Sequence, residues 1–148
     1  MAFKIDRSIV GQEFDRTVFD PVTEAAILAY GASYGETNPL YVDPAAAARG
    51  PHGGLVAPPT FAVSLRGHHF MPRNMPRELG RNGFDAGKDI EMGAPIRPGD
   101  VLTGSSTVHD IYEKTGRSGT MVFIVFRTTV TNQQGEKVAV VDQKMMFR

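Results

Sequence analysis

Three side chains suited to acid-base or hydrogen-bonding chemistry lie within the segment 34–43. Glu36 is a carboxylic acid, Asn38 an amide and Tyr41 a phenol. A carboxylate can hold and deprotonate a water molecule, and a phenol can donate a proton to a reacting atom. Because these three side chains lie in one turn-forming loop directly after a helix, the segment is a candidate catalytic centre.

Each of these side chains also has a structural interpretation. Glu36 can be a solvated carboxylate or half of a surface ion pair. Asn38 precedes Pro39, and in such turns the amide side chain often bonds nearby backbone. Tyr41 can be a packed aromatic residue, because a phenol with a reference pKa of about 10 stays protonated at neutral pH. Both interpretations remain open from the sequence.

A second candidate segment follows at 50–65, where glycines and two adjacent prolines interrupt an apolar run. It contains the histidine nearest in sequence to the catalytic loop, which could supply an imidazole there. The residues predicted to contact substrate are His52, Val56, Ala57, Pro58 and Thr60.

The other histidines are expected to be structural. His68 and His69 are predicted at the end of a second helix, where positive charge is mildly favoured. His109 is predicted on the surface of a strand. No pair has the spacing of a metal site, so the sequence predicts neither a metal nor another cofactor.

The segment 66–87 is the least regular part of the chain and is predicted to be a loop over the sheet edge. Its arginines could bind the phosphate groups of a ligand, or simply keep the loop solvated. These are Arg73, Arg77 and Arg81. Its large apolar residues could line the channel of an apolar ligand or cover the core. These are Met71, Met75 and Phe84.

The catalytic loop must be positioned by a helix that precedes it. Asp20 is a predicted N-cap, Pro21 suits the first turn, and the helix continues from Ala25 to Ser33. Its many alanines allow other backbone to approach closely. Asp43 is predicted to cap a further short helix, 44–49, and a second helix is predicted to open at Pro58.

The C-terminal third reads as antiparallel strands. β-Branched and aromatic residues fill 101–112, 121–131 and 137–147, and glycine-rich turns separate these runs. One helical region followed by a strand meander predicts an α+β fold, specifically a hot-dog fold in which an antiparallel sheet wraps a central helix. The length of 148 residues predicts one domain, 1–148.

Composition excludes several classes of function. The net charge is zero, which argues against nucleic-acid or anionic-membrane partners. The chain has no cysteine, so disulfides, thiolate nucleophiles and cysteine-based metal sites are absent. With no apolar run long enough to cross a bilayer, the chain is expected to be a cytoplasmic protein.

The sequence resembles the MaoC-like acyl dehydratase superfamily, in particular its dehydratase N-terminal, fatty-acid-synthase-1-like branch. The resemblance spans roughly residues 10 to 148 and rests on three segments. They are Gly35-Glu36-Thr37-Asn38-Pro39-Leu40-Tyr41-Val42-Asp43, Gly53-Gly54-Leu55-Val56-Ala57-Pro58-Pro59-Thr60-Phe61, and Arg97-Pro98-Gly99-Asp100 through Ile111-Tyr112-Glu113-Lys114 to Gly116-Arg117-Ser118-Gly119.

The resemblance implies hydration of an enoyl thioester carried on coenzyme A or phosphopantetheine. Active relatives use an Asp, a His five residues later and a backbone amide at a glycine. This chain has Glu36 and Tyr41 at the first two positions, and Pro58, which has no N–H, falls where the glycine amide is expected.

Three functions follow from this comparison. In the first, the chain is an (R)-specific hydratase or dehydratase in which Glu36 is the base that activates water, Tyr41 is the acid and Asn38 orients the loop. In the second, it is a non-catalytic substrate-binding subunit whose partner carries the Asp/His pair. A hot-dog thioesterase using Glu36 is the third. In each case the resemblance implies a homodimer, or a heterodimer with a related hot-dog subunit, formed through sheet edges.

Overall fold

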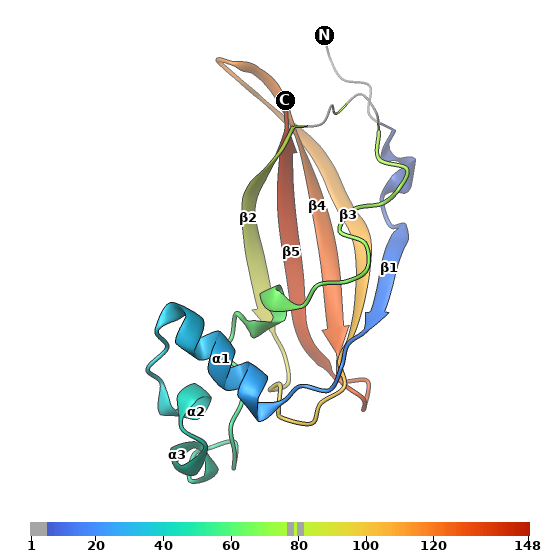
Figure 1. The fold of residues 1–148 in the computed structure, drawn as a ribbon. Helices are drawn as coiled ribbons and strands as arrows, with labels where there is room; N and C mark the ends of the chain where they lie inside the picture. Colours follow the sequence, from blue (N-terminus) through green and yellow to red (C-terminus); the bar gives the residue numbers. More distant parts are fainter. Residues whose placement is uncertain (1–5, 77–78, 80–81) are drawn as a thin grey trace.

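The computed structural model describes residues 6–76, 79 and 82–148 and contains a curled antiparallel sheet with short helices at one end (Figure 1). The strands lie in the order β1-β3-β4-β5-β2. This confirms the predicted α+β class. In chain order the elements are the 3-10 turn η1 (Arg7–Ile9), β1 (Glu13–Val18), α1 (Glu24–Tyr34), α2 (Pro39–Val42), α3 (Pro44–Ala48), the 3-10 turn η2 (Phe61–Ser64), β2 (Gly83–Met92), β3 (Thr103–Gly116), β4 (Gly119–Thr131) and β5 (Lys137–Phe147).

The centre of the sheet is the predicted meander β3–β4–β5. Gly116 pairs with Gly119, so a two-residue loop joins β3 to β4, and Gly119 adopts a φ of 110° that favours glycine. Between β4 and β5 the Asn132 side chain accepts hydrogen bonds from the backbone N–H groups of Gln134 and Glu136. These turns set the register in which the apolar residues of the meander meet one another in the core.

The two edge strands were not predicted. β1 pairs with β3, and β2 pairs with β5. β2 begins at Gly83, and most of its residues are exposed. The prediction that the irregular loop extends to residue 87 is therefore wrong for residues 83–87. The reason is that Lys88, Asp89 and their neighbours do not show apolar alternation, and the strand is defined by its pairing with β5.

Helix α1 begins later than predicted. Its N-cap is Thr23, whose hydroxyl accepts from the N–H of Ala26, and Asp20 lies before the helix. Gly35 ends the helix in the left-handed conformation, with a φ of 75°. Asp43 caps α3 through the N–H of Ala46, as predicted. Figure 1 shows α1 beside one end of the sheet, where its loop leads into α2 and α3.

The inner face of the sheet is crossed by the segment 61–76, which runs in front of β3 and β4 in Figure 1. The helix predicted to open at Pro58 is only the 3-10 turn η2. The chain then extends because the backbone N–H groups of His68 and His69 bond to the side chains of Thr17 and Asp15. We refer to residues 66–74 as the strap.

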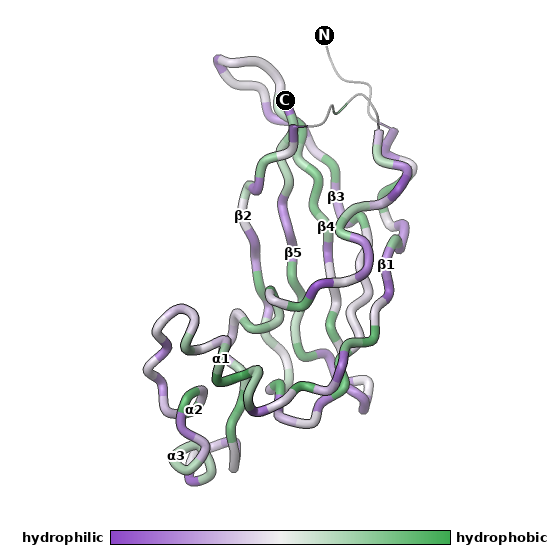
Figure 2. Tube along the Cα trace, viewed as in Figure 1, coloured by the Kyte–Doolittle hydropathy of each residue, from purple (hydrophilic) through white to green (hydrophobic). Residues whose placement is uncertain are grey.

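Two apolar clusters hold the sheet and its cover together. One joins Ile27 of α1 to Val130 and Val138 of the sheet and to Phe61 of η2. The other surrounds Ile124 and Phe126 farther along the sheet. Figure 2 shows the apolar residues concentrated in α1 and along the central strands. Across the part of the chain that the structure describes, no helix combines the length and apolar character needed to cross a membrane.

Replacing Val130 by Ala is expected to lower the free energy of unfolding by about 2–3 kcal/mol, because Val130 is fully buried and its loss leaves a cavity. Val18→Ala is the matched control, since Val18 is also on a strand but is 65% exposed. Both changes lose the same strand propensity, so chemical denaturation of the pair isolates packing. Equal losses would contradict this account of the core.

Candidate functional site

The Glu36 carboxylate is held by three hydrogen-bond donors in the turn after α1. One carboxylate oxygen accepts from the backbone N–H groups of Thr37 and Asn38, both at 2.9 Å. The other accepts from the Tyr34 hydroxyl at 2.8 Å. The side chain is half-buried. The loop is thus closed on the acid, with each oxygen already engaged.

These donors determine the charge of the group. The N–H of Asn38, followed by the Tyr34 hydroxyl, lowers the pKa of Glu36 because both stabilise the ionised carboxylate. Burial, together with the neighbouring Glu36, raises the pKa of Tyr34 to about 12. At neutral pH the pair is therefore a carboxylate and a neutral phenol. A carboxylate stabilised in this way is a weaker base than an ordinary Glu.

Asn38 and Tyr41 have different positions in this loop. The Asn38 side chain accepts from the N–H of Leu40 at 3.0 Å and caps α2, with Pro39 in the first turn. Tyr41 lies on α2 and is half-buried. Within the described part of the chain, no hydrogen bond reaches the Tyr41 hydroxyl, so this phenol is available to a ligand or a partner chain.

The predicted substrate-contacting segment is built into the core more deeply than its sequence indicates. The N–H of Val56 donates to the carbonyl of Leu40, and the N–H of Ala57 donates to the carbonyl of Ile96. Both side chains and that of Pro58 are buried. This brings the segment against α2, while the prolyl nitrogen of Pro58 offers no N–H for an oxyanion.

His52 and Thr60 lie at the two ends of that segment. The carbonyl of His52 accepts from the Arg97 guanidinium at 2.7 Å. Thr60 is exposed, and its hydroxyl oxygen accepts from the Tyr30 hydroxyl at 2.8 Å. In the described residues the donors to Glu36 do not include the His52 imidazole. The structure therefore brings Glu36 next to Asn38 but gives it no imidazole partner.

Two tyrosines of α1 belong to this site although the sequence interpretation did not assign them a role. Tyr30 and Tyr34 are four residues apart, and their rings meet edge to face at 5.4 Å. Tyr34 binds Glu36 and Tyr30 binds Thr60, so the pair connects the acidic turn to η2. An i, i+4 pair of phenols in the last turns before the loop is the sequence signal that predicts this connection.

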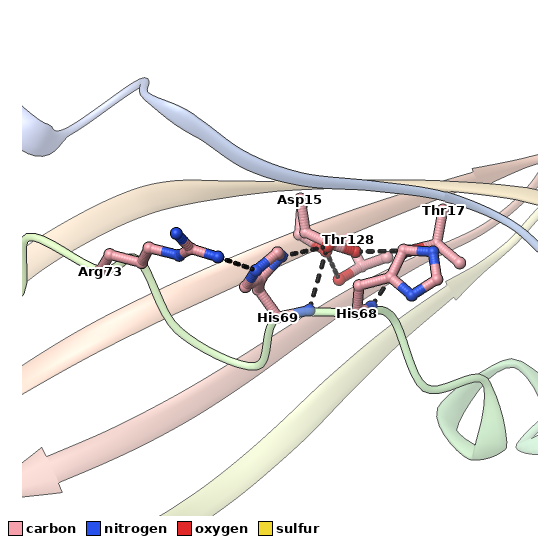
Figure 3. A network of polar contacts seen from close by, with 7 residues as sticks. Asp15, Thr17, His68, His69, Arg73 and Thr128 are labelled. Carbon is pink, nitrogen blue, oxygen red and sulfur yellow. Dashed lines mark hydrogen bonds and ion pairs between the residues drawn. The ribbon is translucent and has the colours of Figure 1, made fainter.

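A second polar cluster lies on the inner face of the sheet, under the strap (Figure 3). Its centre is Asp15, which is 6% exposed. The carboxylate accepts from the Thr17 hydroxyl at 2.7 Å, the N–H of His69 at 3.0 Å and the His69 ring at 3.1 Å. Arg73 lies 3.2 Å from the other ring nitrogen of His69. The cluster fixes the strap across the sheet.

The electrostatics of Asp15 show why this arrangement is tolerated. Burial raises the pKa of the carboxyl, but the hydrogen bonds from Thr17 and His69 outweigh burial, so the pKa of Asp15 is lowered. Gly67 permits the close approach, because a Cβ there would meet the Asp15 carboxylate at 2.2 Å. The prediction that His68 and His69 serve a helix C-terminus is therefore wrong.

The remaining sequence candidates are distributed over the surface and the strap. His109 is exposed at an irregularity in β3, as predicted. Arg73 contacts the His69 ring on the strap. Arg77 and Arg81 lie outside the described residues. Met71 and Met75 line an apolar cavity together with Phe147, and Phe84 is exposed on β2.

Comparison with known proteins places these observations in a family. The FAS1-like dehydratase domain region matches residues 8–141. The chain belongs to the FAS1-like dehydratase family. It is also 31% identical to a UPF0336 protein of Parafrankia sp. over 91% of this chain and 89% of that protein. A UPF0336 protein of Streptomyces coelicolor is 28% identical over 97% of this chain and 95% of that protein.

Solved structures identify the fold as the predicted hot-dog fold. The MaoC-like dehydratase from Rhodospirillum rubrum is 27% identical with a TM-score of 0.69, covering 93% of this chain and 91% of that chain. A chain of the ChsH1-ChsH2 complex from Mycobacterium tuberculosis is 23% identical with a TM-score of 0.74, covering 92% of this chain and 84% of that chain. A chain of HadBC, a 3R-hydroxyacyl-ACP dehydratase complex from M. tuberculosis, is 20% identical with a TM-score of 0.69, covering 94% of this chain and 97% of that chain. The FAS1-like dehydratase chain is thus a MaoC-like hydratase/dehydratase family member.

Tyr34→Phe is expected to raise the pKa of Glu36 in this FAS1-like dehydratase chain, because the variant removes a donor to the ionised carboxylate. Tyr41→Phe is the control and should leave that pKa unchanged. NMR titration of the Glu36 side chain measures both. A Tyr34→Phe titration that overlays the wild type would show that the hydrogen bond does not stabilise the charge.

The same hydrogen bond has a pH signature in stability. Since the folded-state pKa of Glu36 is lowered, its stabilisation is complete above the ordinary Glu pKa of about 4.3 and is lost as pH falls through the folded value. The loss of stability in Tyr34→Phe should therefore be larger at neutral than at acidic pH.

Asp15→Ala is expected to lower the free energy of unfolding by about 2–3 kcal/mol, because several hydrogen bonds to a buried charge disappear together. Glu13→Ala, on the same strand, removes an exposed ion pair with Arg16 and should have a much smaller effect. Chemical denaturation compares them, and hydrogen exchange at the His69 amide should accelerate only in Asp15→Ala. Unchanged exchange would argue against the strap being held by Asp15.

Proposed function

We propose that this chain is the substrate-binding hot-dog subunit of an (R)-specific enoyl-thioester hydratase or 3-hydroxyacyl-thioester dehydratase, and that a related partner subunit carries the Asp/His pair. The substrate is an acyl thioester of coenzyme A or phosphopantetheine, and no further cofactor takes part. The observation that carries the proposal is the Glu36 carboxylate, whose oxygens are occupied by three donors and whose pKa is lowered.

The chemistry sets requirements that this loop does not meet alone. Adding water to an enoyl thioester needs a base for the water, an acid for the α carbon and a donor for the thioester carbonyl. Glu36 is stabilised as an anion, which weakens it as a base. Tyr41 is a phenol where active relatives have an imidazole, and Pro58 lacks an N–H where they have a glycine amide. All three roles are better supplied by a partner.

The edge of the sheet supports pairing with such a partner. Within the described residues β2 pairs only with β5, so its outer edge presents unpaired backbone groups. Phe84 and Met92 on this strand are exposed apolar residues. Two of the similar structures, ChsH1-ChsH2 and HadBC, are heteromeric complexes. We infer that this chain joins a second hot-dog subunit through β2.

One observation favours a second candidate, autonomous hydration by a homodimer. Glu36 keeps a half-buried carboxylate where active relatives have an Asp, and within the described residues no hydrogen bond occupies the Tyr41 hydroxyl. In that case the carboxylate would exchange the Tyr34 hydroxyl for a water molecule when substrate binds. The two candidates differ in whether Glu36 touches the reacting atoms.

The test is hydration of crotonyl-coenzyme A and longer enoyl thioesters, with thioester cleavage followed in parallel. The chain purified alone should bind the thioesters without adding water. Tagged protein recovered from its native cells should carry a second hot-dog chain, and this complex should hydrate them. Within the complex, Glu36→Gln should change kcat by no more than about threefold, because Glu36 does not act as the base. Loss of a true base would lower kcat by roughly 100-fold or more.

Two results would reject the proposal. One is hydration by the pure homomer that falls about 100-fold or more in Glu36→Gln, which would establish the autonomous enzyme. The other is cleavage of the thioester without water addition, which would establish a thioesterase. Tyr41→Phe provides the matched test of the acid in either case.

A further inference from the structure

The inner face of the sheet contains a polar row where a hot-dog core is expected to be apolar. Asp15, Ser106 and Thr128 are register partners on the adjacent strands β1, β3 and β4. Asp15 and Ser106 are buried, at 6% and 9% exposed, and Thr128 is half-buried. Buried polar groups are the exception in protein cores and call for a specific partner.

Part of the row is accounted for by the strap, and part is not. Asp15 and Thr17 are engaged by His68 and His69, as described above. The Ser106 and Thr128 hydroxyls lie 2.8 Å apart. Two hydroxyls sharing one hydrogen bond still have one O–H to donate. In the described residues no acceptor for that second hydrogen is present.

That unused donor faces a cavity of about 110 Å³ between the sheet and the segment 62–70. Ser106, Thr128 and Gln143 line it together with the basic residues Arg66, His69 and Lys88, and its apolar residues include Phe126, Val141 and Leu65. The Gln143 amide nitrogen donates to Asp85 and to the Lys144 carbonyl, which leaves the amide oxygen as an acceptor. The cavity therefore combines a donor, an acceptor and apolar walls.

The cavity is continuous with the elements that position the acidic turn. Ala62 and Val63 of η2 line it, and Phe61 and Thr60, just before them, contact Tyr30 of α1. An acyl thioester held near the Glu36 loop would thus have the cavity on the far side of η2. At roughly 30 Å³ per water-sized group, the cavity holds about four non-hydrogen atoms.

We propose that this cavity binds a hydroxyl-bearing part of the acyl chain, with the remaining O–H of the Ser106–Thr128 pair donating to the hydroxyl oxygen and the Gln143 amide oxygen accepting its hydrogen. The inference rests on the proposed acyl-thioester function and specifies the class of substrate. A plain alkyl chain fits less well, because it would displace water from this donor and acceptor and leave both unpaired. A hydroxyl satisfies both at once.

Binding is measured by calorimetry with saturated acyl-coenzyme A thioesters, which cannot be hydrated. The probes are ω-hydroxyacyl thioesters of increasing length, each beside the plain acyl and the ω-carboxyacyl thioester of the same length. At the length that reaches the cavity, the hydroxyacyl thioester should bind about tenfold tighter than its plain counterpart, as expected for two modest hydrogen bonds.

The diagnostic variant is the double substitution Ser106→Ala/Thr128→Val. It replaces both partners of one hydrogen bond by apolar groups of similar shape, so neither hydroxyl is left unpaired and the fold should be retained. The preference for the hydroxyacyl thioester should fall to about twofold or less, while the affinity for the plain thioester stays unchanged or rises. Thr128→Ser keeps the hydroxyl and should keep the preference.

The outcomes separate the inference from the proposed function. If plain thioesters bind as well as hydroxyacyl thioesters at every length, the cavity holds water only and the inference fails while the proposed function stands. Tightest binding of the ω-carboxyacyl series would also overturn it, in favour of recognition by Arg66 and Lys88 at the cavity rim. If no thioester binds, the proposed function itself fails.

Discussion

The buried Asp15 carboxylate is the constraint on which the inner face of this molecule depends. A charge at this depth must be compensated by hydrogen bonds, and its donors include the backbone and ring of His69. To supply those donors the chain cannot continue as a helix after η2, because a helix would use the same N–H groups internally. The extended strap, the cavity beneath it and the close approach at Gly67 all follow from this requirement.

Glu36 and Asp15 show how the same side-chain chemistry is used at two ends of the fold. Both carboxylates are ionised and have a lowered pKa, and both accept backbone N–H groups from the segment that follows or crosses them. Asp15 is enclosed and fixes the strap. Glu36 is half-buried and closes the turn that joins α1 to α2. Neither is arranged as a free base poised near neutral pH.

The sequence predicts those parts of the structure whose signals are local. The β-branched runs of β4 and β5, a glycine-marked reversal before Gly119 and the Asp43 cap are found where the residues indicate them, whereas β3 continues to Gly116, through the first half of the turn predicted at 113–119. β2 and the strap are not predicted, because both depend on distant partners: β2 on pairing with β5, and the strap on Asp15. For the candidate site, the Glu36–Asn38 turn is predictable from its motif. The link from Glu36 through Tyr34 is a local spacing that motif comparison alone does not reveal.

A division of labour between two hot-dog subunits relaxes the constraints on each of them. A subunit that no longer supplies the base can use its acidic residue to close the loop, and one that no longer supplies an oxyanion donor can accept proline at position 58. Its inner face is then free to carry polar groups that would be unfavourable beside a purely apolar acyl chain. Three features differ from what an active hot-dog dehydratase is expected to have. They are the polar row from Asp15 to Thr128, the phenol at Tyr41 and the Glu36 carboxylate with both oxygens hydrogen-bonded. A subunit specialised for binding accounts for all three with one cause, whereas an autonomous enzyme would need a separate compensation for each.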